Sequence, residues 1–315
     1  MFNRYWRSYP WWMQLIQLIL LISILFFFFV FGLGYGLVPR IMDVDLSELV
    51  KIDASAPVKV INAAFVLQVL FSISVFLLSS LLFAYFTHPR PAGYLGLRKP
   101  GKPVQWVLVL FLMVGAIPII LQIGNWMKLI DFGPEVAAQQ KAYEASLETM
   151  LRMSGVGSFA KVLLIMAVLP AIGEELLFRG VFMRFAARRS RSVVFPILLS
   201  SVMFALVHNN IYGLPAIFLA GALLGTIYYL TGSLYLSILG HFLNNGLQVI
   251  LLYIGSSGSA SVKGMIANDQ LPPYVTVAGA LVFAVSLYLL IRNRTPMPLS
   301  WADDYTEQEL SEKAV

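Results

Sequence analysis

The chain has 315 residues, of which 59% are hydrophobic and only 12% are charged, and its mean hydropathy is +0.79. Soluble domains carry about 25% charged residues, so this composition excludes an ordinary water-soluble protein and predicts several membrane-spanning helices. The absence of cysteine excludes disulfides, thiolate metal ligands and a cysteine nucleophile. The net charge of +6 is explained by basic loops that set membrane topology, so we expect the lipid bilayer and no nucleic acid as a partner.

Eight apolar segments are long enough to cross roughly 30 Å of hydrocarbon as helices. In chain order they cover residues 13–37, 60–86, 104–124, 159–185, 192–209, 213–231, 234–255 and 272–292. The first follows Arg4 and Arg7, but its apolar run is too long for a signal peptide, so we expect an uncleaved anchor. The predicted fold class is an all-α, polytopic membrane helix bundle of about eight transmembrane helices.

The basic residues gather in every second loop. They are Arg90, Arg98, Lys99, Lys102, Arg184, Arg188, Arg189, Arg191, Arg292 and Arg294. Because loops rich in Lys and Arg stay on the cytoplasmic side, this pattern predicts that both termini are cytoplasmic. We expect a multi-pass protein of the plasma or inner membrane.

Two segments outside the spans have a recognisable character. Residues 134–153 repeat Tyr143, Leu147, Met150 and Leu151 at helical spacing, which predicts an amphipathic helix at the outer membrane interface. It is expected to connect two spans, and capping a cavity is the alternative. The acidic tail "SWADDYTEQELSEKAV" is typical of a solvated, partly disordered segment. We therefore divide the chain into an N-terminal region (1–158), a core (159–255) and a last span with its tail (256–315).

The fourth span contains the charged stretch "GEELLFRG" at 173–180. A charged side chain at the centre of a spanning helix costs about 2.5–3.5 kcal/mol on insertion scales, so such residues are rarely kept without a role. Glu175 and Arg179 are four residues apart and can pair on one helical face. Glu174 is turned about 100° away from Glu175. A purely structural ion pair thus explains Glu175 and Arg179 but leaves Glu174 without a partner.

Polar partners for Glu174 occur in two later segments. His208 ends "FALVH", and His241 opens "HFLNN", which places Asn245 one turn after His241. His88, the only other histidine, is expected to lie at a membrane edge. Because Glu174, His208 and the pair His241 and Asn245 belong to three separate spans, we expect these four residues to converge in one buried polar cluster.

Such a cluster has two possible chemical uses. In the first, Glu174 acts as a general base toward a water that His208 helps to hold, while His241 and Asn245 donate hydrogen bonds to the oxyanion of a tetrahedral intermediate. In the second, Glu174, His208 and His241 bind zinc and leave one position open. The sequence leaves both the metal-free and the zinc-dependent site open.

At these residues the chain resembles the CPBP family of intramembrane proteases, which comprises CAAX proteases and bacteriocin-processing (Abi) proteins. The family pattern EExxxR, FxxxH and HxxxN appears in family order as "EELLFR" (174–179), "FALVH" (204–208) and "HFLNN" (241–245). The resemblance implies an intramembrane endopeptidase acting on a membrane-associated peptide or protein. It also implies that Glu174, His208, His241 and Asn245 are catalytic and that Glu175 and Arg179 support them. Prenylated substrates belong to the eukaryotic members and are not indicated by this sequence.

Other functions fit the sequence less well. No HExxH zinc motif occurs. The "GSSG" at 255–258 matches the GxSG serine motif of rhomboid proteases, but no histidine follows it. A proton-coupled transporter would more often show inverted repeats, and no such repeat is visible. A non-enzymatic immunity or scaffold protein, in which the polar cluster is purely structural, is the remaining alternative.

Overall fold

The computed structural model describes residue 6 and residues 9–50, 52–53, 55–190, 192–256 and 271–297. Within these ranges all regular structure is helical, which confirms the predicted all-α membrane bundle. Three of the sequence features fall outside this part of the chain. They are the acidic tail, the second half of the "GSSG" motif, and the basic residues Arg4, Arg7 and Arg191.

Seven helices in the described part of the chain are long and apolar enough to cross a membrane. They are Trp11–Met42, Val58–Thr87, Val104–Met127, Val156–Ala187, Leu214–Thr231, Leu234–Gly255 and Pro273–Arg292, and each coincides with an expected span. The remaining expected span, residues 192–209, is the apolar helix α13 (Val194–Val207) with 14 residues. At 1.5 Å per residue α13 covers about 21 Å, which is less than the roughly 30 Å of hydrocarbon. It is therefore too short to cross the hydrocarbon on its own.

Three of the long spans alternate between α-helical and π-helical turns. The first consists of α2 (Trp11–Phe26), the π-helical stretch Phe27–Tyr35 and α3 (Gly36–Met42), and the second of α5 (Val58–Phe71), the stretch Ser72–Leu78 and α6 (Ser79–Thr87). The fourth consists of α10 (Val156–Leu163), Leu164–Val168, α11 (Leu169–Glu175), Leu176–Phe182 and α12 (Met183–Arg189). The other helices are α4 (Leu46–Val50), α7 (Pro91–Tyr94), α8 (Val104–Met127), α9 (Pro134–Met150), α14 (Leu214–Thr231), α15 (Leu234–Ser256) and α17 (Pro273–Arg292).

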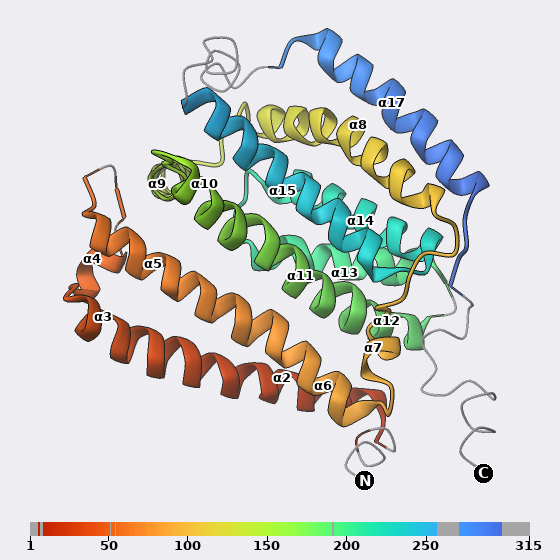
Figure 1. Ribbon diagram of the computed structural model, residues 1–315, viewed down its shortest axis with the longest axis horizontal. Helices are drawn as coiled ribbons and strands as arrows, with labels where there is room; N and C mark the ends of the chain where they lie inside the picture. Colours follow the sequence, from red (N-terminus) through yellow and green to blue (C-terminus); the bar gives the residue numbers. More distant parts are fainter. Residues whose placement is uncertain are drawn as a thin grey trace.

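The helices form three groups across the bundle, as Figure 1 shows. On one side the first span (α2–α3) packs with the second (α5–α6), and on the opposite side α8 packs with α17. The α10–α12 helix runs between them, with α15 against α11 and α13 against α12 and α14. At the α8–α17 contact, a Cβ on Gly115 would lie 2.5 Å from the backbone nitrogen of Phe283. Only glycine allows this approach, as expected where membrane helices pack through small residues.

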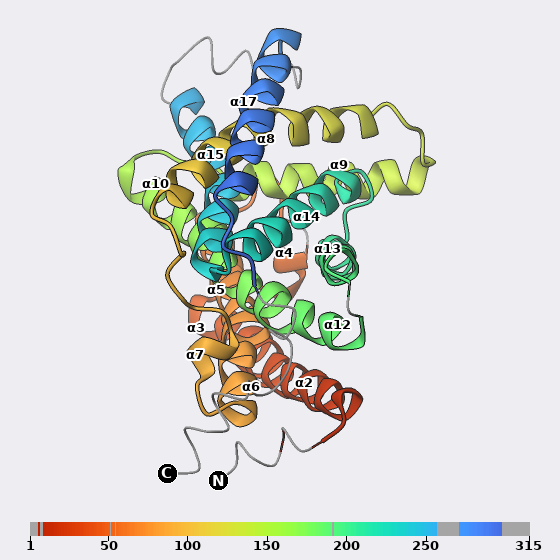
Figure 2. The same cartoon turned by 90° about the vertical axis from the view of Figure 1, so that its right-hand side faces the viewer.

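Helix α9 is oriented differently from the spans. It is seen end-on in Figure 1 and lengthwise in Figure 2, so it lies across one end of the bundle, far from α7 at the other end. Pro134 begins it after Gly133, whose φ of 91° favours glycine. At its far end Met150 and Leu151 pack into an apolar cluster with Phe65. This orientation is the one expected of an amphipathic helix at a membrane interface.

Candidate active site

The charged segment lies where the fourth span leaves regular α-helical geometry. The seven residues of α11 are flanked by π-helical turns on both sides, and such turns are frequent at functional sites. Pro170 in α11 has no N–H to donate to the carbonyl of Met166, four residues earlier. That carbonyl accepts a hydrogen bond from Asn245 Nδ2 at 3.4 Å, which joins the fourth span to α15.

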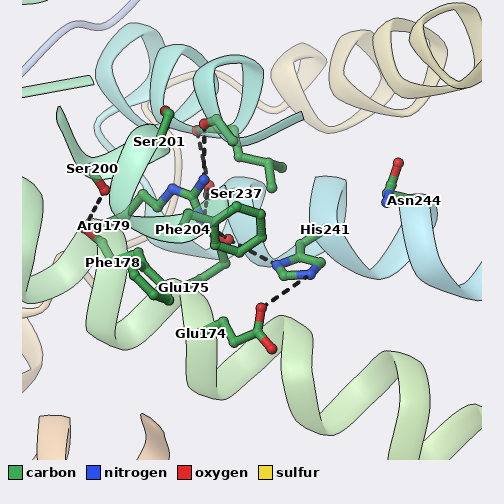
Figure 3. A network of polar contacts seen from close by, with 12 residues as sticks. Glu174, Glu175, Phe178, Arg179, Ser200, Ser201, Phe204, Ser237, His241 and Asn244 are labelled. Atoms are coloured by element: carbon green, nitrogen blue, oxygen red, sulfur yellow. Dashed lines mark hydrogen bonds and ion pairs between the residues drawn. The ribbon is translucent and has the colours of Figure 1, made fainter. Parts of the chain in front are cut away.

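Glu175 is completely buried and its carboxylate is fully engaged (Figure 3). Oε1 accepts hydrogen bonds from Arg179 Nη1 and from His241 Nδ1, the latter at 2.9 Å. Oε2 accepts a hydrogen bond from Ser237 Oγ at 2.6 Å. The predicted pairing of Glu175 with Arg179 is therefore present, and two residues of α15 complete it.

Arg179 contacts two other groups besides the Glu175 carboxylate. Nη2 donates to the carbonyl oxygen of Gly221 on α14 at 2.9 Å, and the guanidinium carbon lies 4.7 Å from the centre of the Phe204 ring. A Cβ added to Gly221 would lie 3.3 Å from Nη2, which is a tight contact. The lack of a side chain at Gly221 thus brings the α14 backbone close enough for its carbonyl oxygen to accept a hydrogen bond from Arg179.

Glu174 has a different environment, although it is the next residue in the chain. The residue is 9% exposed, and its buried Oε2 has no hydrogen-bond partner among the described residues. In Figure 3 the carboxylate points toward His241, with Oε2 at 3.9 Å from Nε2. A polar separation of this size is one that a water molecule spans, with about 2.8 Å to each atom. The predicted contrast between the two glutamates is therefore present.

His208 approaches the same side of the site from the end of α13. Its Nδ1 lies 2.7 Å from the carbonyl oxygen of Phe204. Because a carbonyl only accepts, this nitrogen carries the hydrogen and Nε2 is left as an acceptor in the neutral ring. The Phe204 ring lies 4.8 Å from the His208 ring and 5.6 Å from the His241 ring, so it packs against both histidines.

Asn245 lies one turn beyond His241 on α15, at the edge of the cluster. In addition to its bond to Met166, its Oδ1 accepts a hydrogen bond from Asn244 Nδ2 at 3.0 Å. The structure therefore joins Glu175, Arg179 and His241 in direct contacts and places Glu174 Oε2 at 3.9 Å from His241 Nε2. His208 contacts this group through Phe204. Asn245 lies one turn beyond His241 and joins α15 to the fourth span.

His88 is not part of this cluster. It is buried near α7, where its Nδ1 accepts a hydrogen bond from the backbone nitrogen of Arg90 at 3.0 Å. Its ring centre lies 5.7 Å from that of Tyr94.

The sequence interpretation missed two partners of the buried ion pair. Ser237 binds Glu175, and the Gly221 carbonyl binds Arg179. Ser237 precedes His241 by four residues, so the helical period puts both on one face of α15. Ser237 could therefore have been predicted as a member of the polar cluster from its spacing to His241. The Gly221 carbonyl could not, because every residue has a backbone carbonyl and no sequence pattern marks this one.

The candidate residues do not form a ready-made metal site. Over the described ranges, no group of three or more His, Asp or Glu side chains is close enough to hold one metal ion. His241 Nδ1 and His208 Nδ1 face a carboxylate and a carbonyl oxygen, respectively. Because Nδ1 of each ring faces a fixed acceptor, Nε2 is the nitrogen that remains for a water molecule or another ligand.

Seven apolar helices around a buried cluster of carboxylates, an imidazole and a guanidinium define a multi-pass integral membrane protein with a polar centre. The sequence model of the family described as type II CAAX prenyl endopeptidase Rce1-like matches residues 157–247, under a third of the chain. The match contains all six candidate residues. Over these residues the chain is similar to the CAAX-protease family, which confirms the resemblance seen in the sequence. Comparisons with curated proteins and with solved structures found no match.

Proposed function

We propose that this protein is an intramembrane endopeptidase in which Glu174 activates water to hydrolyse a peptide bond of a membrane-associated peptide or protein. The observation that carries the proposal is the contrast between the adjacent carboxylates. Glu175 is saturated by Arg179, His241 and Ser237, whereas Glu174 Oε2 has no protein partner in the described residues and faces His241 Nε2. A buried carboxylate with an unused oxygen is suited to accept a proton from water.

The proposed reaction has two steps. Glu174 takes one proton from the water as its oxygen bonds to the peptide carbonyl carbon, and His208 Nε2 accepts a hydrogen bond from the remaining O–H. The carbonyl becomes an oxyanion, to which a protonated His241 Nε2 and the Asn245 amide donate. The carbon–nitrogen bond then breaks as Glu174 passes its proton to the leaving amine. The carboxylate is regenerated, and one water is consumed for each peptide bond.

The groups that surround His241 support its role as a donor. Glu175 fixes the hydrogen on Nδ1, and Arg179 and Ser237 fix Glu175. These contacts on the Nδ1 side fix the orientation of the His241 ring, and Nε2 is turned toward Glu174. A buried carboxylate that orients a histidine in this way is a recurring arrangement in hydrolases.

We also propose that catalysis does not require a metal. In the described residues the candidate ligands do not gather into a group of three that could hold one metal ion, which favours the water mechanism over zinc. Treating purified protein with a strong zinc chelator should leave its activity unchanged. Loss of activity that returns when zinc is added would show that the cofactor has been assigned wrongly.

The proposal includes the orientation in the membrane, with both termini cytoplasmic. The end of the bundle near α7 carries Arg90, Arg98 and Arg184, as the positive-inside rule requires for the cytoplasmic side. Because the natural chain lacks cysteine, single cysteines placed near α7 and near α9 report the orientation directly. In intact cells, a membrane-impermeant thiol reagent should modify only the cysteine near α9.

The decisive experiment compares purified wild-type protein with Glu174→Gln in lipid vesicles that contain a library of membrane-associated peptides. Activity should fall by roughly 10²–10⁴, the range for loss of a general base. Glu148→Gln on α9 is the matched control, because this glutamate is exposed and far from the cluster in sequence, and it should retain activity. Solute transport without cleavage would support a transporter instead. Full function of Glu174→Gln would support a scaffold.

A further inference from the structure

The stretch "HFLNN" ends in two asparagines, and the proposed mechanism uses only the second, Asn245. Asn244 lies within the spanning helix α15, beyond His241, and is half-buried (Figure 3). A polar side chain inside a membrane-spanning helix is costly unless it forms hydrogen bonds, and it is rarely kept without a role. Asn244 therefore needs an explanation of its own.

The side chains of the two asparagines are hydrogen-bonded to each other, although they are neighbours on one helix. Asn244 Nδ2 donates to Asn245 Oδ1 at 3.0 Å. Successive residues of a helix are rotated by about 100° and do not normally face each other. The two amides are therefore turned toward each other around the helix, and their contact is not a simple result of their spacing.

The other end of the Asn245 amide faces the fourth span. Its Nδ2 donates to the carbonyl oxygen of Met166, which is available because Pro170 has no N–H. This contact, at 3.4 Å, is longer than the usual hydrogen-bond range of about 2.7–3.2 Å, whereas the contact from Asn244 lies within that range. Asn244 is therefore the stronger of the two partners that orient this amide.

The orientation of the Asn245 amide decides whether it can stabilise an oxyanion. An asparagine amide has a donor end with two hydrogens and an acceptor end of nearly the same shape. Asn244 Nδ2 can only donate, so it fixes the Oδ1 end of Asn245. One hydrogen of the opposite end binds Met166, and the second is left for the oxyanion. If the amide rotated by about 180°, Oδ1 would take the place of the donor and would repel the developing negative charge.

We propose that Asn244 is a positioning residue that holds the Asn245 amide with its donor end toward the reacting carbonyl. The inference rests on the proposed function, because it requires Asn245 to donate to the oxyanion. It gives the first asparagine of "HFLNN" a role in the reaction without any contact with the substrate.

Asn244→Leu tests the inference, because leucine has a similar size and no hydrogen-bond donor. We expect kcat to fall roughly three- to tenfold, the effect of one neutral hydrogen bond. KM should stay the same, because the oxyanion forms only during the reaction. Asn245→Leu should have the larger effect, a fall in kcat of roughly 10²–10³, because it removes the donor itself.

Two comparisons separate positioning from a purely structural role. Gln248→Leu is the matched control, because Gln248 lies one turn later on the same helix but donates to the backbone carbonyl oxygen of Asn244. It should keep the wild-type kcat. In the background of Asn245→Leu, Asn244→Leu should have no further effect on kcat, because no amide is left to orient. Asn244→Ala should give the same loss as Asn244→Leu, which excludes an effect of the bulkier leucine on packing.

A second readout does not depend on activity. In protein labelled with ¹⁵N-asparagine, the side-chain amide signal of Asn245 is identified by its absence from Asn245→Leu. Its hydrogens should exchange with heavy water several-fold faster in Asn244→Leu, because the amide has lost a fixed partner. In Gln248→Leu the exchange rate should equal that of the wild type.

Unchanged kcat and unchanged exchange in Asn244→Leu would overturn the role of Asn244 alone, provided that Glu174→Gln and Asn245→Leu are inactive. A higher KM with unchanged kcat would also overturn it, because Asn244 would then bind substrate rather than orient Asn245. An active Glu174→Gln variant would instead overturn the proposed function.

Discussion

Two adjacent residues of one helix, Glu174 and Glu175, occupy regions of opposite character. The region around Glu175 is closed: the residue is 0% exposed, and both carboxylate oxygens accept hydrogen bonds. The region around Glu174 is open on one side, with an oxygen that has no partner in the described part of the protein and a histidine nitrogen 3.9 Å away. A rotation of about 100° between neighbouring helical residues is enough to place them in these two environments.

The comparison separates two ways of keeping a charge inside a membrane protein. The Glu175 region contains its own counter-charge and satisfies it with hydrogen bonds, so it contributes to structure. The Glu174 region leaves one carboxylate oxygen without a hydrogen bond. This costs free energy, and such charged groups are rarely kept inside a membrane without a function. The difference predicts that substitutions in one region change stability and that substitutions in the other change activity.

The largest effect is expected from exchanging the two carboxylates for amides one at a time. Glu174→Gln should lose activity by roughly 10²–10⁴ and remain folded, because an amide removes the cost of a buried charge. Glu175→Gln should instead lower the thermal stability in detergent, because it leaves Arg179 as a buried unpaired charge. An active Glu174→Gln together with an inactive but well-folded Glu175→Gln would mean that the base is Glu175.

Arg179→Leu tests the closed region around Glu175 by removing the positive charge that pairs with this carboxylate. Breaking a buried ion pair costs about 3–5 kcal/mol in soluble proteins, so poor membrane accumulation and a lower melting temperature should be the main defects. The double variant Glu175→Gln/Arg179→Leu should recover part of this stability, because no unpaired charge remains. If the double variant is no more stable than Arg179→Leu, the pair does not contribute as described.

Ser237→Ala should have a smaller effect in the same direction. It removes one hydrogen bond to a charged group, worth about 1.5–3 kcal/mol, while the Arg179 and His241 contacts of Glu175 remain. Ser201→Ala is the matched control, because Ser201 is also buried but donates to the backbone of its own helix at Ile197. Thermal unfolding of both variants should give the larger shift for Ser237→Ala.

The smallest effect is expected from Gly221→Ala, which tests the close approach of α14 to Arg179. The added methyl would lie 3.2 Å from Phe204 and 3.3 Å from Arg179 Nη2, so these side chains must move slightly. The strain of about 1–3 kcal/mol is partly offset by the better helix propensity of alanine, about 1 kcal/mol. Gly124→Ala on α8, whose nearest neighbour would lie 4.0 Å away, should cause no loss of stability.

The arrangement of spans was largely predictable because membrane helices leave a strong hydrophobic signal. Seven expected segments appear as helices of spanning length, with ends within a few residues of the prediction. The exception, α13, is equally apolar but only 14 residues long. Its length is set where the chain turns at His208 and Asn209, and the left-handed conformation of Asn209 is not visible as hydrophobicity.

At the site, residue identity was easier to predict than contacts. The periodicity of a single helix was enough to pair Glu175 with Arg179 and to turn Glu174 away, and both features are present. That His241 binds Glu175 through Nδ1 depends on how α11 and α15 approach, and the π-helical turns around α11 change the rotation of the residues that follow them. No residue pattern marks these turns, so the side-chain directions could not be derived. The catalytic roles remain predictions, as does the three-part division of the chain.

The local character of the Glu175–Arg179 pair has a consequence for how the protein is made. The other partners of this pair come much later in the chain: Gly221 is 42 residues after Arg179, and Ser237 and His241 are 62 and 66 residues after Glu175. At about 5–20 residues per second, the ribosome needs roughly 3–13 s to synthesise the last of them. During that interval the fourth span must enter the bilayer without them. The two opposite charges, four residues apart, can neutralise each other within the helix that carries them. The nascent span can therefore insert first and acquire its remaining partners when α14 and α15 arrive.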